Sequence, residues 1–193
     1  MSEGSTKRVP KKETIERAAM ELFARYGFAG ATIKDIAGLA GVTEGALYRH
    51  YSGKEELAAA LFDRELSAIH DSLARSLAEP GAPANKLRAV IEYIYGRYHD
   101  DPWPLLFVIL NFQHLQGDSR PDEKKHIYDY VTQYITKLFR GRPGHRDLEF
   151  LATLVTGLVI QPVIFHYYGR LPRHPLEYVD EIWRSCCLLA GLS

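Results

Sequence analysis

The chain has 193 residues and a formal net charge of zero, with 24 Lys and Arg against 24 Asp and Glu. Hydrophobic residues make up 46% and charged residues 25%, a globular composition that excludes a disordered chain. The longest mainly apolar run, 151–165, is shorter than the roughly 20 residues of a membrane span, so we expect no membrane partner. The polar N-terminal segment is not a secretory signal, and the adjacent Cys186 and Cys187 exclude a disulfide framework. These features favour a cytoplasmic location.

The charge is distributed unevenly along the chain. Residues 1–54 contain nine Lys and Arg against six Asp and Glu, a balance of +3, and the remainder therefore carries −3. A basic segment attached to a mildly acidic body suggests that one end of the protein meets a polyanion. The arm from Lys7 to Lys12 adds to this charge, and the sequence leaves open whether it is ordered or touches DNA.

Helical periodicity runs through nearly the whole chain and predicts an all-α protein of about nine helices, three short ones followed by a larger bundle. Glycine, proline and capping residues separate the helices. Gly27 ends the first, Thr32 and Thr43 cap the next two, and Gly41 lies between these. We expect the later helices at about 54–77, 87–98, 102–112, 127–138, 146–168 and 175–190, with a kink at Pro162.

Residues 32–51 are typical of a helix-turn-helix, because two helices of about eight residues are joined by a tight turn at Gly41. In such a unit the second helix enters the major groove with its first turns against the base edges. Small, aromatic and hydrogen-bonding side chains remain for its outer face: Thr43, Gly45, Ala46, Tyr48, Arg49 and His50. Lys54, at the start of the next helix, is expected to reach a phosphate. The alternative is that these are ordinary bundle helices with a tyrosine-rich surface.

Three ordered segments carry a resemblance to a known family: 27–37, 41–51 and Lys54-Glu55-Glu56-Leu57. Together they resemble the N-terminal domain of TetR-type transcriptional regulators over roughly residues 9–69. The resemblance implies a homodimeric, all-helical repressor with a helix-turn-helix DNA-binding domain at 9–69 and a ligand-binding and dimerisation domain at 70–193. It also implies that one set of side chains lies at or near the DNA: Thr32, Lys34, Thr43, Gly45, Tyr48, Arg49, His50 and Lys54.

Two positions depart from the family pattern. Glu44 stands where Lys or Arg is common, so this residue is expected to repel a phosphate. Gly53 replaces a common polar cap, at a cost of only a few tenths of a kcal/mol.

The resemblance implies that the last two helices form the dimer interface, and their apolar stripes exceed what one surface helix needs. The residues are Leu151, Leu154, Val155, Leu158, Val179, Ile182, Trp183 and Cys186. The alternative is that they fill the core of one subunit.

Large aromatic side chains in the middle of the chain are suited to line a cavity for a mostly apolar or aromatic effector. The candidates are Tyr95, Trp103, Phe107, His114, Tyr128, Phe165 and His166. A plain aromatic core is the alternative. His99, Asp100 and Asp101 lack a partner at metal-ligand spacing, so no metal or other cofactor is expected, and no catalytic motif is present.

The sequence therefore predicts a ligand-responsive transcriptional regulator that is not an enzyme. It is expected to bind a palindromic double-stranded operator as a homodimer and to be released by a small effector. The alternative function is that of a helical-bundle small-molecule binding protein or enzyme without DNA binding.

Overall fold

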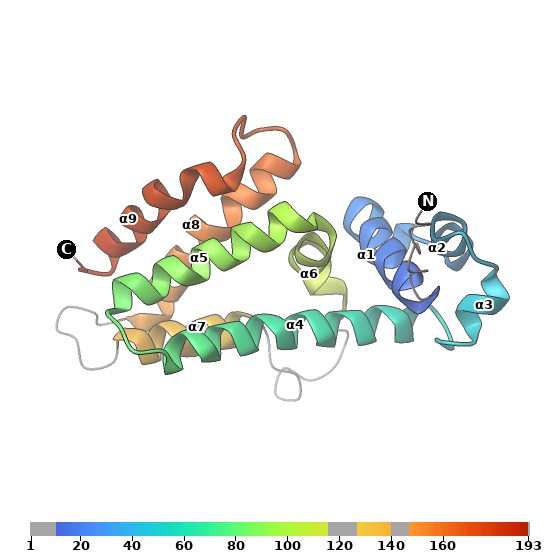
Figure 1. Ribbon diagram of the computed structural model, residues 1–193, viewed down its shortest axis with the longest axis horizontal. Helices are drawn as coiled ribbons and strands as arrows, with labels where there is room; N and C mark the ends of the chain where they lie inside the picture. Colours follow the sequence, from blue (N-terminus) through green and yellow to red (C-terminus); the bar gives the residue numbers. More distant parts are fainter. Residues whose placement is uncertain (1–10, 116–126, 140–146, 193) are drawn as a thin grey trace, which may run out of the picture. The chain divides into compact units, whose positions relative to one another are not determined.

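The structure is a computed structural model that describes residues 11–115, 127–139 and 147–192 (Figure 1). In this part of the chain there are nine α-helices, one short 3₁₀ helix and no strand, which confirms the all-α prediction. The α-helices are α1 (Lys11–Gly30), α2 (Ile33–Ala40), α3 (Glu44–Tyr48), α4 (Lys54–Ala78), α5 (Pro83–Asp100), α6 (Pro102–Leu115), α7 (Ile127–Phe139), α8 (Leu148–Tyr167) and α9 (Val179–Leu189).

The helices group into two compact units, which are described separately. The first unit takes the chain up to Glu65 and returns for residues 103–117, and the second takes 66–102 and 118–193. Helix α4 therefore contributes to both units, and α6 belongs with the N-terminal helices. This division differs from the predicted boundary after residue 69, which gives α6 to the C-terminal domain.

The predicted glycine and threonine signals determine where the N-terminal helices end. Gly27 has φ 72° and ψ 166°, so α1 breaks there before its last turn to Gly30. Gly41, with φ 67°, ends α2 in the left-handed conformation that other residues rarely adopt. Its backbone N–H donates to carbonyls of the preceding turn, as expected of a helix C-terminus.

The core of the first unit is built around α6. Phe107 is fully buried, and its ring stacks on Phe23 of α1 with 5.5 Å between centroids. The edge of a second ring, Phe62 of α4, meets Phe107 at 6.2 Å. Aromatic pairs in these geometries add to the stabilisation from burial, so α6 joins α1 to the first half of α4.

In the second unit, α5 lies beside α9 and the 3₁₀ helix η1 (Pro175–Tyr178), while α7 packs on α8 (Figure 1). One α-helix over 175–190 was expected, but its first turn is 3₁₀. His174 explains the difference. Its Nδ1 accepts from the N–H of Leu176, and the backbone N–H of His174 donates to the Glu177 carboxylate. This capping box tightens the turn around Pro175.

Helix α8 runs through Pro162 without an interruption and has 20 residues. Among the described residues it is the one helix that is long and apolar enough, by length and composition alone, to cross a membrane. The helix is therefore longer than the apolar run 151–165, whose length made the sequence predict no membrane span. Part of its apolar surface is buried in the second unit, by Leu151, Ala152, Val155, Val159 and Val163.

Candidate nucleic-acid interface

Two threonine caps define the helix-turn-helix. The Thr32 hydroxyl accepts from the N–H of Asp35 at 3.2 Å and donates to the Asp35 carboxylate at 2.5 Å. The Thr43 hydroxyl accepts from the N–H of Ala46 at 3.2 Å. These bonds satisfy N–H groups that a helix start leaves without an internal partner. Both predicted caps are therefore confirmed, and they fix where α2 and α3 begin.

Helix α3 has five residues, fewer than the eight expected. Arg49 and His50 lie in the turn that follows it, where the N–H groups of His50 and Tyr51 both donate to the Leu47 carbonyl. The helix stops because Tyr51 turns into the core, where it is 6% exposed. Arg49 and His50 are consequently presented from a turn rather than from the helix.

Most of the predicted outer face is exposed to solvent. Tyr48 is 52% exposed, whereas its neighbour Leu47 is fully buried against the unit. A Cβ added at Gly45 would meet no atom closer than 4.0 Å, so packing does not require this glycine. Ala46 is half-buried, and the other candidates on α2, α3 and the turn are exposed: Thr32, Lys34, Thr43, Arg49 and His50.

Lys54 has a role that the sequence did not indicate. Its ammonium donates to the carbonyls of Phe28 at 2.9 Å and Ala31 at 3.0 Å, and lies 4.5 Å from the centroid of the Phe28 ring. The end of α1 leaves such carbonyls without helical partners. Lys54 therefore joins the start of α4 to the end of α1, and one of its three N–H donors remains for a phosphate.

A buried polar cluster lies behind the helix-turn-helix, and the sequence gives no sign of it because its members lie far apart in the chain. Glu16 of α1 is 6% exposed and accepts from the Tyr51 hydroxyl at 2.5 Å. Arg64 of α4 forms an ion pair with the other oxygen of Glu16 and also bonds Glu65 at 3.2 Å. Lys12 lies 3.8 Å from Glu16. The cluster joins α1, α4 and the segment after α3.

The charges of this cluster set its ionisation. Burial disfavours the Glu16 carboxylate, but the hydrogen bonds from Tyr51 and Arg64 and the charges of Arg64 and Lys12 outweigh it, so the Glu16 pKa is lowered. Burial and the bond to Glu16 raise the pKa of Tyr51. At neutral pH the carboxylate is therefore ionised and the phenol protonated, as the bond between them requires.

The predicted effector residues are not brought together in one described cavity. Trp103 and Phe107 belong to the first unit, where Phe107 fills the core and the Arg25 guanidinium lies 4.7 Å from the Trp103 ring. Tyr95 is fully buried in the second unit and donates to the Val159 carbonyl at 3.0 Å. Phe107 and Tyr95 thus belong to the cores of their units, and a role in effector binding stays a prediction for them.

The other effector candidates are separated as well. His166 accepts from or donates to the Tyr98 hydroxyl at 2.9 Å, and Phe165 is 47% exposed on α8. The side chains of His114 and Tyr128, and the residues Lys7 and Arg8 of the basic arm, lie outside the described residues.

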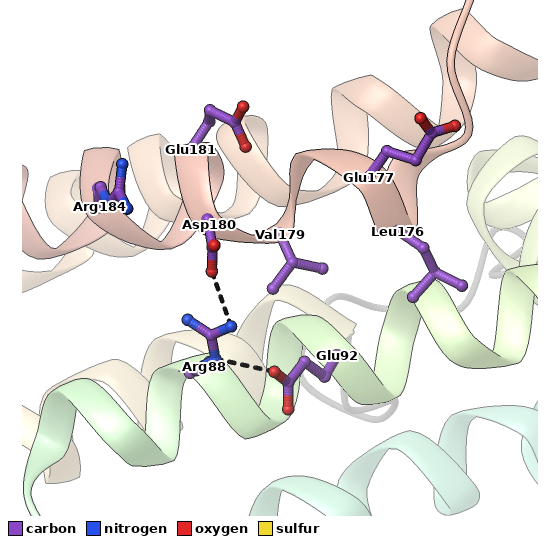
Figure 2. A pocket seen from close by; sticks show the side chains of 8 residues that line it. All are labelled: Arg88, Glu92, Leu176, Glu177, Val179, Asp180, Glu181 and Arg184. Atoms are coloured by element: carbon purple, nitrogen blue, oxygen red, sulfur yellow. Dashed lines mark hydrogen bonds and ion pairs between the residues drawn. The ribbon is translucent and has the colours of Figure 1, made fainter.

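One groove of about 470 Å³ is open in the second unit, between α5 and the η1–α9 segment (Figure 2). Arg88 crosses it, with ion pairs to Glu92 at 2.8 Å and Asp180 at 2.7 Å. Its walls also hold Glu177, Glu181 and Arg184, so the groove is charged and does not suit an apolar effector.

The predicted dimer residues divide into two groups. Leu151, Val155, Val179 and Cys186 are buried within the second unit, which leaves them little surface for a partner, and the dimer interface itself stays a prediction. Leu154, Leu158, Ile182 and Trp183 keep part of their surface, although the Trp183 indole N–H donates to the Ala84 carbonyl. The sequence missed exposed apolar side chains on the same two helices, namely Phe150, Leu188 and Leu189.

Comparison with known proteins agrees with the geometry of the first unit. Residues 15–61 match the family model described as bacterial regulatory proteins, tetR family. By this match the N-terminal part of the chain is similar to the tetR family. The tetR-type segment is 50% identical over 62 residues to the transcriptional regulator TtgR of Pseudomonas putida, a match that covers 32% of this chain and 29% of TtgR.

Solved structures extend the likeness from the tetR-type segment to the whole fold. A TetR-like regulator from Rhodococcus has a TM-score of 0.71 at 23% identity, over 96% of this chain and 98% of that one. The regulator FadR of Bacillus subtilis, solved in complex with stearoyl-CoA, has a TM-score of 0.67 at 17% identity, over 94% and 100%. The sequence match to TtgR thus covers less than a third of its length, and the rest of the resemblance is one of fold.

Proposed function

We propose that this protein is a transcriptional regulator that binds a specific double-stranded DNA operator. The observation that carries the proposal is the free face of α3 and its flanking turn, where exposed Tyr48, Arg49 and His50 surround the small residues Gly45 and Ala46. Small residues allow close approach to a groove, and the side chains around them are suited to bases and phosphates. The tetR-type match of residues 15–61 supports the same function.

The exposed apolar surface of the second unit supports a homodimer. Exposed residues on α8 recur on one side of the helix, from Phe150 and Leu154 through Gly157 to Phe165, and Leu188 and Leu189 of α9 are exposed too. We name this surface the α8–α9 stripe. Apolar helix surface of this kind is favourable to bury against a second copy. A two-fold dimer would present two reading units to half-sites one helical turn apart, about 34–36 Å.

The regulated state is proposed to depend on a small effector bound in the C-terminal part. The stearoyl-CoA complex of the structurally similar FadR supports an apolar, acyl-type ligand for this fold. Binding would favour a conformation of the dimer with lower operator affinity, through the difference in effector affinity between two states. We propose that the protein acts in the cytoplasm as a repressor. Its activity is binding rather than catalysis.

Selection of bound fragments from random DNA tests the proposal with the full-length protein. We expect a pseudo-palindromic site whose affinity falls linearly with log salt. Enrichment of no symmetric site, together with affinity that does not respond to salt, would contradict it. Thermal-shift and calorimetric screens of apolar, aromatic and acyl compounds test the effector, and absence of binding across these classes would remove that part.

A further inference from the structure

Within the first unit, helix α6 presents one face to α1. Trp103, Phe107 and Asn111 follow one another at intervals of four residues, which places them on the same side of a helix. The Arg25 guanidinium lies over the Trp103 ring, and Phe107 stacks on Phe23. Asn111 is fully buried, and its side-chain amide donates to the Phe23 carbonyl at 2.9 Å. All three α6 residues therefore contact the second half of α1.

Asn111 is an unusual residue for this position. Its Oδ1 has no hydrogen-bond partner and is the buried side-chain polar atom without one among the described residues. Leaving such an atom unsatisfied destabilises the folded protein, and an apolar residue of similar size would avoid that cost. The opposite orientation of the amide would place its oxygen against the carbonyls of Phe23 and Phe107, which its Nδ2 now binds. Packing alone therefore does not account for Asn111.

The Phe23 carbonyl that Asn111 binds lies just before the break in α1. Phe23 is in the last regular turn before the break at Gly27. Beyond the break, Lys54 holds the carbonyls of Phe28 and Ala31, and the next residue is the Thr32 cap of α2. The short end of α1 is thus held from both sides of Gly27, by Asn111 on α6 and by Lys54 on α4.

We infer that Asn111 is a positioning residue for DNA recognition. Its amide fixes the end of α1 against α6, and α1 in turn carries the packing surface of α2. Release of this bond leaves the reading helices folded but less firmly oriented. A dimer then discriminates less between correctly and incorrectly spaced half-sites. Ordering a loosely held helix-turn-helix costs more entropy at the correct spacing, and such a unit adapts more easily to a wrong spacing. This inference rests on the proposed function.

The test compares wild type with Asn111→Leu on the selected operator and on the same operator with one base pair inserted between its half-sites. For Asn111→Leu we expect binding to the intact operator to weaken about tenfold, equivalent to the loss of one buried hydrogen bond of about 1.4 kcal/mol. The affinity ratio between the two operators should shrink by a similar factor. Tyr134→Phe is the control, because it removes a part-buried hydrogen bond to Ser76 in the second unit.

The outcomes of this binding experiment separate the proposed function from the role of Asn111. A wild-type protein that binds no symmetric operator overturns the proposed function and this inference with it. A wild type that binds, with an Asn111→Leu ratio equal to that of Tyr134→Phe, overturns the inference alone. If Asn111→Leu fails to fold, Asn111→Ala removes the same bond to the Phe23 carbonyl with a smaller side chain. We expect the ratio to shrink in the same way, and an unchanged ratio there also overturns the inference.

Discussion

The hydroxyl of Tyr51 donates to the buried carboxylate of Glu16 across 35 positions of sequence, at 2.5 Å. Tyr51 follows the turn after α3, and Glu16 lies in α1. This bond, with the Arg64 ion pair on the other oxygen of Glu16, holds the end of the helix-turn-helix onto the rest of the unit. The surface that we propose to face DNA therefore depends on a charged group behind it.

The Glu16 cluster gives the first unit a predictable acid sensitivity. Because the Glu16 pKa is lowered on folding, its contribution to stability is present above the unfolded value of 4.5. That contribution is lost as the pH falls through the folded pKa. Chemical unfolding between about pH 3 and 7 should show this loss in the wild type. Glu16→Gln should be less stable at neutral pH and flatter in the acid range, and a parallel pair of curves would contradict the assignment.

Tyr48→Ala should weaken operator binding about tenfold or more, since a side chain that reads bases contributes roughly 1–3 kcal/mol. The melting temperature should stay unchanged, because Tyr48 is 52% exposed. Tyr26→Ala is a matched control, since this α1 tyrosine is 63% exposed outside the helix-turn-helix. Equal effects of the two substitutions in a titration at fixed salt would argue against a reading role for Tyr48.

Lys34→Ala should weaken binding to all DNA sequences alike. Lys34 is exposed on the first turn of α2, where it suits a phosphate contact rather than a base. Removal of one phosphate contact lowers the slope of log affinity against log salt by about one. Titrations at several salt concentrations measure this slope, and a change in sequence preference with the same slope would show that Lys34 reads bases instead.

Lys54→Met should behave differently from Lys34→Ala. It removes the bonds to the Phe28 and Ala31 carbonyls, so we expect a loss of about 1–3 kcal/mol in the free energy of unfolding as well as weaker DNA binding. Denaturant titration of the two variants separates the effects. Unchanged stability in Lys54→Met would mean that water replaces the ammonium at the end of α1.

Leu154→Arg should disrupt the homodimer, because Leu154 is 37% exposed in the α8–α9 stripe and a charge there is costly to bury in an interface. Sedimentation analysis should show a smaller species with intact helical content. Leu176→Arg is the control, because this residue is 36% exposed on η1, outside the stripe. A dimer that persists in Leu154→Arg but not in the control would place the interface elsewhere.

Much of the fold could be predicted from local signals. The Thr32 and Thr43 caps and the positive φ of Gly27 and Gly41 involve residues no more than five positions apart, so the sequence determines them directly. The outward face of α3 follows from the same helical period, and its exposure agrees with the prediction.

Long-range relationships could not be read in this way. The bond between Asn111 and Phe23 spans 88 positions, and that between Lys54 and Phe28 spans 26. An apolar stripe also does not reveal which neighbour will cover it, and so the sequence alone does not show that Phe107, Tyr95 and Val155 lie in the interior. The sequence by itself determined the helices, their ends and the helix-turn-helix, because hydrogen bonds within one turn fix these. Only the tertiary structure decided which faces are buried and how the reading unit is held, because that depends on which distant segments pack together.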